Sequence, residues 1–111
     1  MKILLTGLLL SMLSVSSYAD LVSYYGRGFH GKKTASGEVF NQNAMTAASN
    51  SHKMGTKLKV TNIATGKSVI VKINDTGGFA KYGRRLDLSQ GAFARIAPLS
   101  QGICKVKIER L

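Results

Sequence analysis

Alternation of apolar and polar residues is the feature that most constrains what this chain can fold into. Two segments, KLKVTN at 57–62 and KSVIVKIN at 67–74, place every second side chain on one apolar face. The side chains on these faces are Leu58, Val60, Val69, Val71 and Ile73. A period of two is that of a β-strand rather than a helix. Because the short segment IATG, ending at Gly66, lies between them, we expect the two strands to form a hairpin.

The remaining segments predict more strands and one short helix. Further strands are expected at residues 20–25, 44–49, 86–88 and 103–110. Ser89 can cap a helix that ends before Pro98. Five or six short strands in so small a chain would expose sheet edges unless the sheet closes on itself. The sequence therefore predicts a mainly β fold, a closed barrel with one or two short helices.

The N-terminal segment 1–19 has the pattern of a secretory signal peptide. Lys2 supplies the positive end, residues 3–13 the apolar centre, and Ser17-Tyr18-Ala19 a small-x-small cleavage site. A membrane anchor is the alternative, but the apolar stretch is shorter than the roughly 20 residues that a spanning helix needs. We predict export to the periplasm or cell envelope, or secretion, with a single domain at 20–111 and no membrane span after cleavage.

Charge and cysteine content restrict the partners. The chain has a formal net charge of +11, and such a surface attracts polyanions such as nucleic acid, anionic lipid or cell-wall polymers. Export makes nucleic acid the less expected partner, and an evenly solvated basic face is the plain alternative. Cys104 is the only cysteine, which excludes an internal disulfide and a cysteine-based zinc cluster. It alternates with Val106 and Ile108, so we expect it to be buried.

Two carboxylates stand out in a chain that has only five acidic residues. Asp75 ends the strand in VKINDTGGF, and Glu38 lies in the polar, turn-rich segment 27–43. An aspartate before Gly-Gly often bonds nearby backbone amides, and a loop glutamate is often only solvated. The alternative is that both side chains are chemical groups facing a sugar.

Several stretches together resemble a known family. They are VSYYGRGFHGKKTASGEVFN, MTAAS, GTKLKVTN, SVIVKINDTGGF, GRRLDLS and AFARIA, which run from about Val22 to Ile108. These motifs are similar to those of the RlpA-like double-psi β-barrel domain, known from rare lipoprotein A, a septal-ring lytic transglycosylase acting on peptidoglycan. The resemblance implies a six-stranded double-psi β-barrel with an open groove, as also found in expansins.

The resemblance also implies which residues act. Family members carry a Glu in the TASGE motif and an Asp in the INDRGPF motif, which correspond here to Glu38 and Asp75. The family usually has a His at the position of Ser49. Thr76 and Gly78 stand where the family has Arg and Pro. His52, three residues after Ser49, is the imidazole nearest to that position in the sequence.

The implied activity is that of an exported peptidoglycan lytic transglycosylase cutting between N-acetylmuramic acid and N-acetylglucosamine. Such cleavage delivers a proton to the glycosidic oxygen, and a hydroxyl of the same sugar closes a 1,6-anhydro ring, so one carboxyl group can act as acid and then as base. Asp75 is the candidate for this role, with Glu38 polarising the hydroxyl, orienting the sugar or stabilising positive charge. No metal or cofactor is expected. The alternative is a non-catalytic, expansin-like module that binds wall polysaccharide.

Further residues are candidates for contacts with the glycan. They are Tyr25, Asn41, Ser49, His52, Asn74, Thr76 and Tyr82. Tyr25 and Tyr82 are expected to be partly exposed so that they can stack on sugar faces, although such aromatics are more often part of a core. Asp87 is interpreted as structural. The expected partners are peptidoglycan strands and wall anions bound by a monomer, whereas a basic antimicrobial or nucleic-acid-binding protein is suggested by charge alone.

Overall fold

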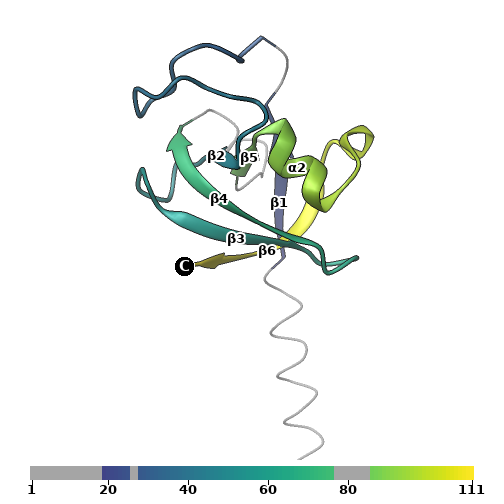
Figure 1. The fold of residues 1–111 in the computed structure, drawn as a ribbon. Helices are drawn as coiled ribbons and strands as arrows, with labels where there is room; N and C mark the ends of the chain where they lie inside the picture. The colour runs from purple at the N-terminus through teal and green to yellow at the C-terminus, as the bar shows by residue number, and fades with distance from the viewer. Residues whose placement is uncertain (1–18, 26–27, 77–85) are drawn as a thin grey trace, which may run out of the picture.

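Six strands lie in the residues that the structure, a computed structural model, describes, namely 19–25, 28–76 and 86–111. They close into a barrel in the order β1-β5-β2-β4-β3-β6 (Figure 1). Their bounds are β1 Asp20–Tyr24, β2 Thr46–Ala48, β3 Lys57–Asn62, β4 Ser68–Asp75, β5 Leu86–Leu88 and β6 Cys104–Arg110. Closure pairs both edges of every strand, which confirms the predicted mainly β barrel.

Two parallel strand pairs set the topology of the barrel. β1 pairs in parallel with β5, and β2 pairs in parallel with β4. The predicted hairpin is confirmed, because β3 and β4 are antiparallel and join Lys57 to Lys72 at one end and Thr61 to Ser68 at the other. β4 therefore runs from the hairpin turn to Asp75 at the far end of the barrel (Figure 1).

The alternating side chains fill the barrel as their period predicts. The buried core consists of Val22, Ala47, Leu58, Val60, Val69, Val71, Ile73, Leu86, Leu88, Ala92, Phe93, Ile96, Ala97, Cys104 and Val106. Cys104 is buried as expected, and Ile108 packs against this core from a half-buried position. Burial of these apolar faces is the main source of stability for a chain with no disulfide among its described residues.

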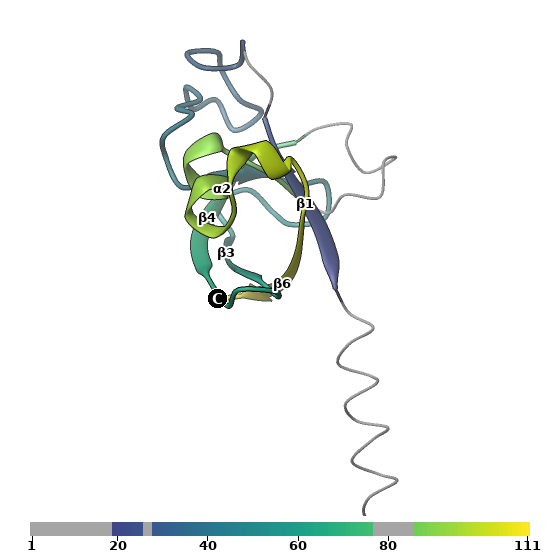
Figure 2. The ribbon, with the colours of Figure 1, turned by 90° about the vertical axis from the view of Figure 1, so that its right-hand side faces the viewer.

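One α-helix, α2 at Gln90–Ile96, packs beside β4 and β1 (Figure 2). Ser89 caps it, since its hydroxyl accepts from the Ala92 N–H at 3.1 Å. Gly91 is required at the contact with the loop before β2, because a Cβ there would lie 2.8 Å from the Asn43 carbonyl oxygen. A short 3₁₀ turn, η2 at Leu99–Gln101, follows Pro98. The predicted helix and its end at the proline are confirmed.

A second, smaller core lies under the segment 28–45, which covers the end of the barrel where β4 terminates (Figures 1 and 2). It consists of Tyr25, Phe40 and Ala48. The expected signal peptide lies outside the described residues apart from Ala19, and so does the segment 77–85 with Tyr82. Within the parts of the chain that are described, no helix is both long and apolar enough to cross a bilayer.

Candidate active site

The strand end that carries Asp75 is shaped by a β-bulge. Ala47 pairs with Ile73, but the next residue, Ala48, pairs with Asp75, so Asn74 is an extra residue in β4. A bulge bends the strand and re-aims the side chains that follow it. Asn74 is buried, whereas Asp75 is half-buried at the edge of the barrel.

Asp75 accepts hydrogen bonds on both carboxylate oxygens. The N–H groups of Ala35 and Thr76 donate to Oδ1 at 2.9 and 2.8 Å. The Tyr25 hydroxyl donates to Oδ2 at 2.9 Å. The hydrogen bonds to backbone amides that are typical of a turn aspartate are therefore present. In addition, Asp75 accepts a hydrogen bond from the hydroxyl of Tyr25, which is 50 positions away in the sequence. Three polar donors therefore fix the position of the Asp75 carboxylate.

Glu38 reaches the same strand end on a turned-back loop, residues 33–39. A β-bridge between the two ends of this loop closes it, and the Thr34 hydroxyl donates to the Glu38 carbonyl oxygen at 3.0 Å. The Ser36 N–H donates to the Asn74 carbonyl oxygen at 3.2 Å, which fastens the loop to β4. Thr34 and Ser36 therefore shape the loop that carries Glu38, within the segment predicted to be rich in turns.

Glu38 and Asp75 thus lie at the same end of β4, but their surroundings differ. Glu38 is exposed, and the Lys72 ammonium donates to its Oε2 at 3.0 Å. This hydrogen bond and the charge of Lys72, aided by Ser36 and Asn74, hold the pKa of Glu38 below its usual value. Glu38 is therefore ionised at neutral pH and is suited to stabilising positive charge rather than to donating a proton.

Tyr25 is buried, so the expected partial exposure of its ring is wrong. Only 6% of the residue is exposed, because the ring stacks on Phe40 at 4.4 Å and contacts Phe29 edge-on at 5.7 Å. Burial, together with the hydrogen bond to Asp75, raises the pKa of Tyr25 far above its usual value. Phe29, the other described ring that contacts Tyr25, is 49% exposed.

Ser49 and His52 lie side by side behind Asp75. The Ser49 N–H donates to the Asp75 carbonyl oxygen at 2.9 Å, and the Ser49 hydroxyl lies 3.3 Å from His52 Nδ1. The Ser49 hydroxyl also accepts from the N–H groups of Ser51 and His52, both at 3.1 Å. Ser49 is almost fully buried and His52 is half-buried. The imidazole nearest in sequence therefore contacts the very side chain that replaces the family His, and substrate binding by either residue stays a prediction.

The other predicted contact residues are divided between this place and its surroundings. Thr76 is exposed directly beside Asp75. The Asn74 Oδ1 is buried and has no hydrogen-bond partner within the described ranges. Asn41 is exposed, and its side chain accepts from the Asn43 N–H at 2.9 Å, which makes it part of a local turn. Tyr82 lies outside the described residues.

Sequence reasoning missed three participants, Lys72, Ala35 and Phe29. Lys72 is 34 residues from Glu38 and looks like one more outward lysine in an alternating strand, so no local signal marks it. Ala35 acts through its backbone, which the residue type does not reveal. Phe29 lies in the turn-rich segment 27–43, where no periodic pattern tells whether an aromatic ring is exposed or buried.

Asp87 lies on β5 and takes part in a hydrogen bond between two strands, which agrees with its interpretation as a structural residue. The Ser23 hydroxyl donates to Asp87 Oδ1 at 2.7 Å, across the parallel pair of β1 and β5. The two residues are opposite each other in the strand register. This bond therefore ties two strands of the barrel together.

Comparison with protein families identifies the barrel. A double-psi β-barrel family model described as lytic transglycolase matches residues 18–108, which is most of the chain.

The chain belongs to the RlpA-like double-psi β-barrel family. Among curated members, the Campylobacter jejuni endolytic peptidoglycan transglycosylase RlpA is 45% identical over 100 residues, covering 89% of this chain and 36% of the relative. The Rickettsia felis protein of the same name is 51% identical over 92 residues, covering 80% of this chain and 40% of the relative. The chain therefore spans well under half the length of these family members.

Solved structures support the same fold. The apo expansin from Clavibacter michiganensis matches with a TM-score of 0.66 and 22% identity, over 84% of this chain and 49% of the expansin chain. At this level of identity the match concerns the fold alone. The double-psi barrel of the RlpA-like family is thus the scaffold on which Asp75, Glu38 and Tyr25 come together.

Proposed function

We propose that this protein is an exported peptidoglycan lytic transglycosylase that cuts between N-acetylmuramic acid and N-acetylglucosamine and leaves a 1,6-anhydro end. The observation that carries the proposal is the meeting of Asp75 and Glu38, from segments far apart in the sequence, at one end of the barrel. Membership of the family supports the reaction class. The names of the relatives, endolytic peptidoglycan transglycosylases, support the substrate.

The different surroundings of the two carboxylates suit different roles. Asp75 is half-buried and held by three donors, so its position relative to a bound sugar is fixed. It would protonate the glycosidic oxygen and then take the proton from the hydroxyl that closes the anhydro ring. Glu38, kept ionised beside Lys72, would stabilise the positive charge that develops on the sugar ring.

Among the aromatic rings that the structure describes, Phe29 is the best placed for a contact with the sugar. It is exposed beside the buried ring of Tyr25, whose hydroxyl reaches Asp75. An exposed aromatic face can pack against the apolar C–H face of a sugar, and this contact would take the role first predicted for Tyr25. Asn74, Thr76 and His52 remain candidates for hydrogen bonds to the glycan.

A non-catalytic wall-binding module is the second candidate function. The observation that favours it is the replacement of the family His by Ser49, whose hydroxyl is occupied by local hydrogen bonds. In this alternative the same strand end holds the glycan and no bond is cut.

One experiment separates the two functions. The purified protein is incubated with sacculi, bound protein is measured by sedimentation, and soluble products are examined by mass spectrometry for anhydro-muramyl ends. We expect such products from the unmutated protein and from Glu109→Gln, a control that removes a carboxylate on β6, far along the chain from Asp75. Products should be lost in Asp75→Asn and reduced in Glu38→Gln. Binding without any products from the unmutated protein would instead establish the wall-binding module.

Binding of wall anions is proposed for the outer face of β3 and β6. Lys57 and Lys59 on β3 and Lys105 and Lys107 on β6 are exposed, and of these Lys107 lies 3.8 Å from Glu109. Such a cationic face would hold phosphate or carboxylate groups of wall polymers through screened electrostatics. The fraction of the protein that sediments with sacculi should therefore fall as salt is added.

We also propose that the protein acts as a monomer in the cell envelope.

A further inference from the structure

Among the residues that the structure describes, the hydrogen bonds around Asp75 leave one position open on its carboxylate. An ionised carboxylate offers about four lone-pair positions, two on each oxygen. Within the described residues, Oδ1 accepts from both Ala35 and Thr76, and Oδ2 accepts only from Tyr25. The lone pair that no described residue occupies is therefore on Oδ2.

We propose that Oδ2 is the atom through which Asp75 gives and takes its proton, and that Tyr25 is the positioning residue that holds this oxygen. The inference rests on the proposed lytic reaction and adds to it the identity of the reacting oxygen. It also assigns Tyr25 a role that differs from the sugar stacking expected from the sequence.

The chemistry of the three donors supports this choice of oxygen. A backbone N–H can only donate, so a proton placed on Oδ1 would point at the N–H groups of Ala35 and Thr76. A proton on Oδ2 can occupy the lone pair that Tyr25 does not use, where it is not directed at the phenol and can pass to a substrate. Tyr25 can therefore keep donating to the other lone pair of Oδ2 in both protonation states of Asp75. A group that acts as acid and then as base requires such a fixed position.

The reaction step is balanced without another reactant. The proton on Oδ2 moves to the glycosidic oxygen as the bond from that oxygen to the anomeric carbon breaks. The 6-hydroxyl oxygen of the same sugar then bonds to the anomeric carbon, and its proton goes to Oδ2. Asp75 ends in the protonation state in which it began, and Tyr25 gives and takes no proton.

The packing of Tyr25 fits a positioning role. Its ring is held between Phe40, stacked at 4.4 Å, and Phe29, edge-on at 5.7 Å. Among the described residues, the hydroxyl of this buried ring has one hydrogen-bond partner, the Oδ2 of Asp75. The raised pKa of Tyr25 means that the phenol keeps its proton throughout the pH range in which the protein would work.

The test compares two tyrosines that each lose only a hydroxyl group. Tyr25→Phe removes the bond to Asp75, and Tyr24→Phe removes a bond of similar length, 2.8 Å, from the neighbouring tyrosine to the Leu99 carbonyl oxygen. We expect kcat on sacculi to fall about 10-fold to 100-fold in Tyr25→Phe, with KM unchanged within about twofold, because a hydrogen bond to a charged group is lost. Tyr24→Phe should keep the kcat of the unmutated protein. Equal kcat values in Tyr25→Phe and the unmutated enzyme would overturn the proposal.

Amide hydrogen exchange provides a readout that does not depend on cleavage. The Ala35 and Thr76 amides are protected by Asp75, so loosening of its carboxylate in Tyr25→Phe should speed their exchange about tenfold. Tyr24→Phe should leave both amides unchanged. If the unmutated protein makes no anhydro products, the lytic function and proton transfer through Oδ2 fail together. The exchange rates then decide the positioning role alone, and unchanged rates in Tyr25→Phe overturn it too.

Discussion

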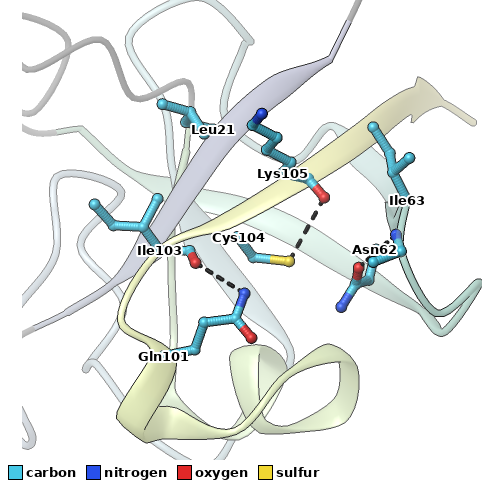
Figure 3. A pocket seen from close by; sticks show the side chains of 8 residues that line it. Leu21, Asn62, Ile63, Gln101, Ile103, Cys104 and Lys105 are labelled. Carbon is cyan, nitrogen blue, oxygen red and sulfur yellow. Dashed lines mark hydrogen bonds between the residues drawn. The ribbon is translucent and has the colours of Figure 1, made fainter. Parts of the chain in front are cut away.

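The polar groups at the two ends of β4 have different surroundings and different roles. At the Asp75 end, side chains and amides from three separate segments converge on one half-buried carboxylate. At the hairpin end lies a pocket of about 410 Å³ with a mostly apolar lining (Figure 3). Its lining residues are Leu21, Asn62, Ile63, Ala64, Gln101, Ile103, Cys104 and Lys105.

The polar groups at the hairpin end are used to hold the fold together. The buried Asn62 amide donates to the Ile96 carbonyl oxygen at 2.7 Å, at the end of α2, and its Oδ1 accepts from the Ala64 N–H at 2.9 Å. The Cys104 thiol points at the Lys105 carbonyl oxygen at 3.6 Å (Figure 3). Asn62 therefore joins the helix to the hairpin, whereas Asp75 keeps a free lone pair within the described residues. We infer that substitutions at the Asp75 end change activity and those at the hairpin end change stability.

The largest effect is expected from Asp75→Asn. Loss of a general acid and base should lower the cleavage rate on sacculi by about 10²-fold to 10⁴-fold. The amide oxygen of Asn can still accept the backbone donors, so the free energy of unfolding in urea should change by no more than about 1 kcal/mol. An Asp75→Asn protein that cleaves at the unmutated rate, or that is unfolded, would break the contrast between the two ends.

Asn62→Ala should have the opposite pattern. It removes two hydrogen bonds and leaves the Ile96 carbonyl oxygen buried without its partner, so the free energy of unfolding should fall by about 2–3 kcal/mol. Because the site is remote from Asp75, kcat below the melting temperature should stay within about twofold. Thr61→Ala, on the half-exposed outer side of β3, is the matched control and should cost far less stability. Loss of activity with unchanged stability would contradict the assignment.

The strands and the helix of the barrel could be predicted from the sequence because each is specified by a pattern within a short stretch of the chain. Alternation in β3 and β4, the Gly66 turn and the Ser89 cap each depend on residues that are close in the chain. The order of the strands could not be obtained in this way. The parallel pairing of β1 with β5 joins Val22 to Leu86, and no periodic pattern records such a distant contact.

The candidate site was predicted only in part, for a related reason. Asp75 and Glu38 were found because motifs carry them, and the loop around Glu38 was anticipated from its turn residues. The partners that define their chemistry are distant or belong to the backbone, such as Lys72 for Glu38 and the Ala35 N–H for Asp75. Tyr25 was expected at the surface because adjacent tyrosines in YYG have no pattern that tells which ring packs on Phe40.

A smaller effect is expected when the partner of Glu38 is removed. Lys72 lowers the pKa of Glu38, so Glu38 stays ionised at a lower pH than a free glutamate would. In Lys72→Met the pKa of Glu38 should rise toward its ordinary value, and the acid limb of the cleavage rate should move to higher pH. The control is Lys67→Met, which removes an exposed lysine from the hairpin turn between β3 and β4, outside the proposed wall-binding face. An acid limb that stays in place in Lys72→Met would show that ionised Glu38 is not needed for cleavage.

The smallest effect concerns Cys104 at the hairpin end. Burial raises the pKa of its thiol, so the folded protein keeps the proton at a pH where the unfolded chain, with a thiol pKa of about 8.5, loses it. The stability from this group is therefore complete below about pH 8.5 and is lost as the pH rises toward the pKa of the folded state. Cys104→Ala should cost about 1 kcal/mol at pH 7. Between pH 7 and pH 9.5 it should lose less stability in urea unfolding than the unmutated protein. Cleavage by Cys104→Ala at the unmutated rate would support the inference that the hairpin end affects stability but not activity. A loss of activity in this folded variant would contradict that inference.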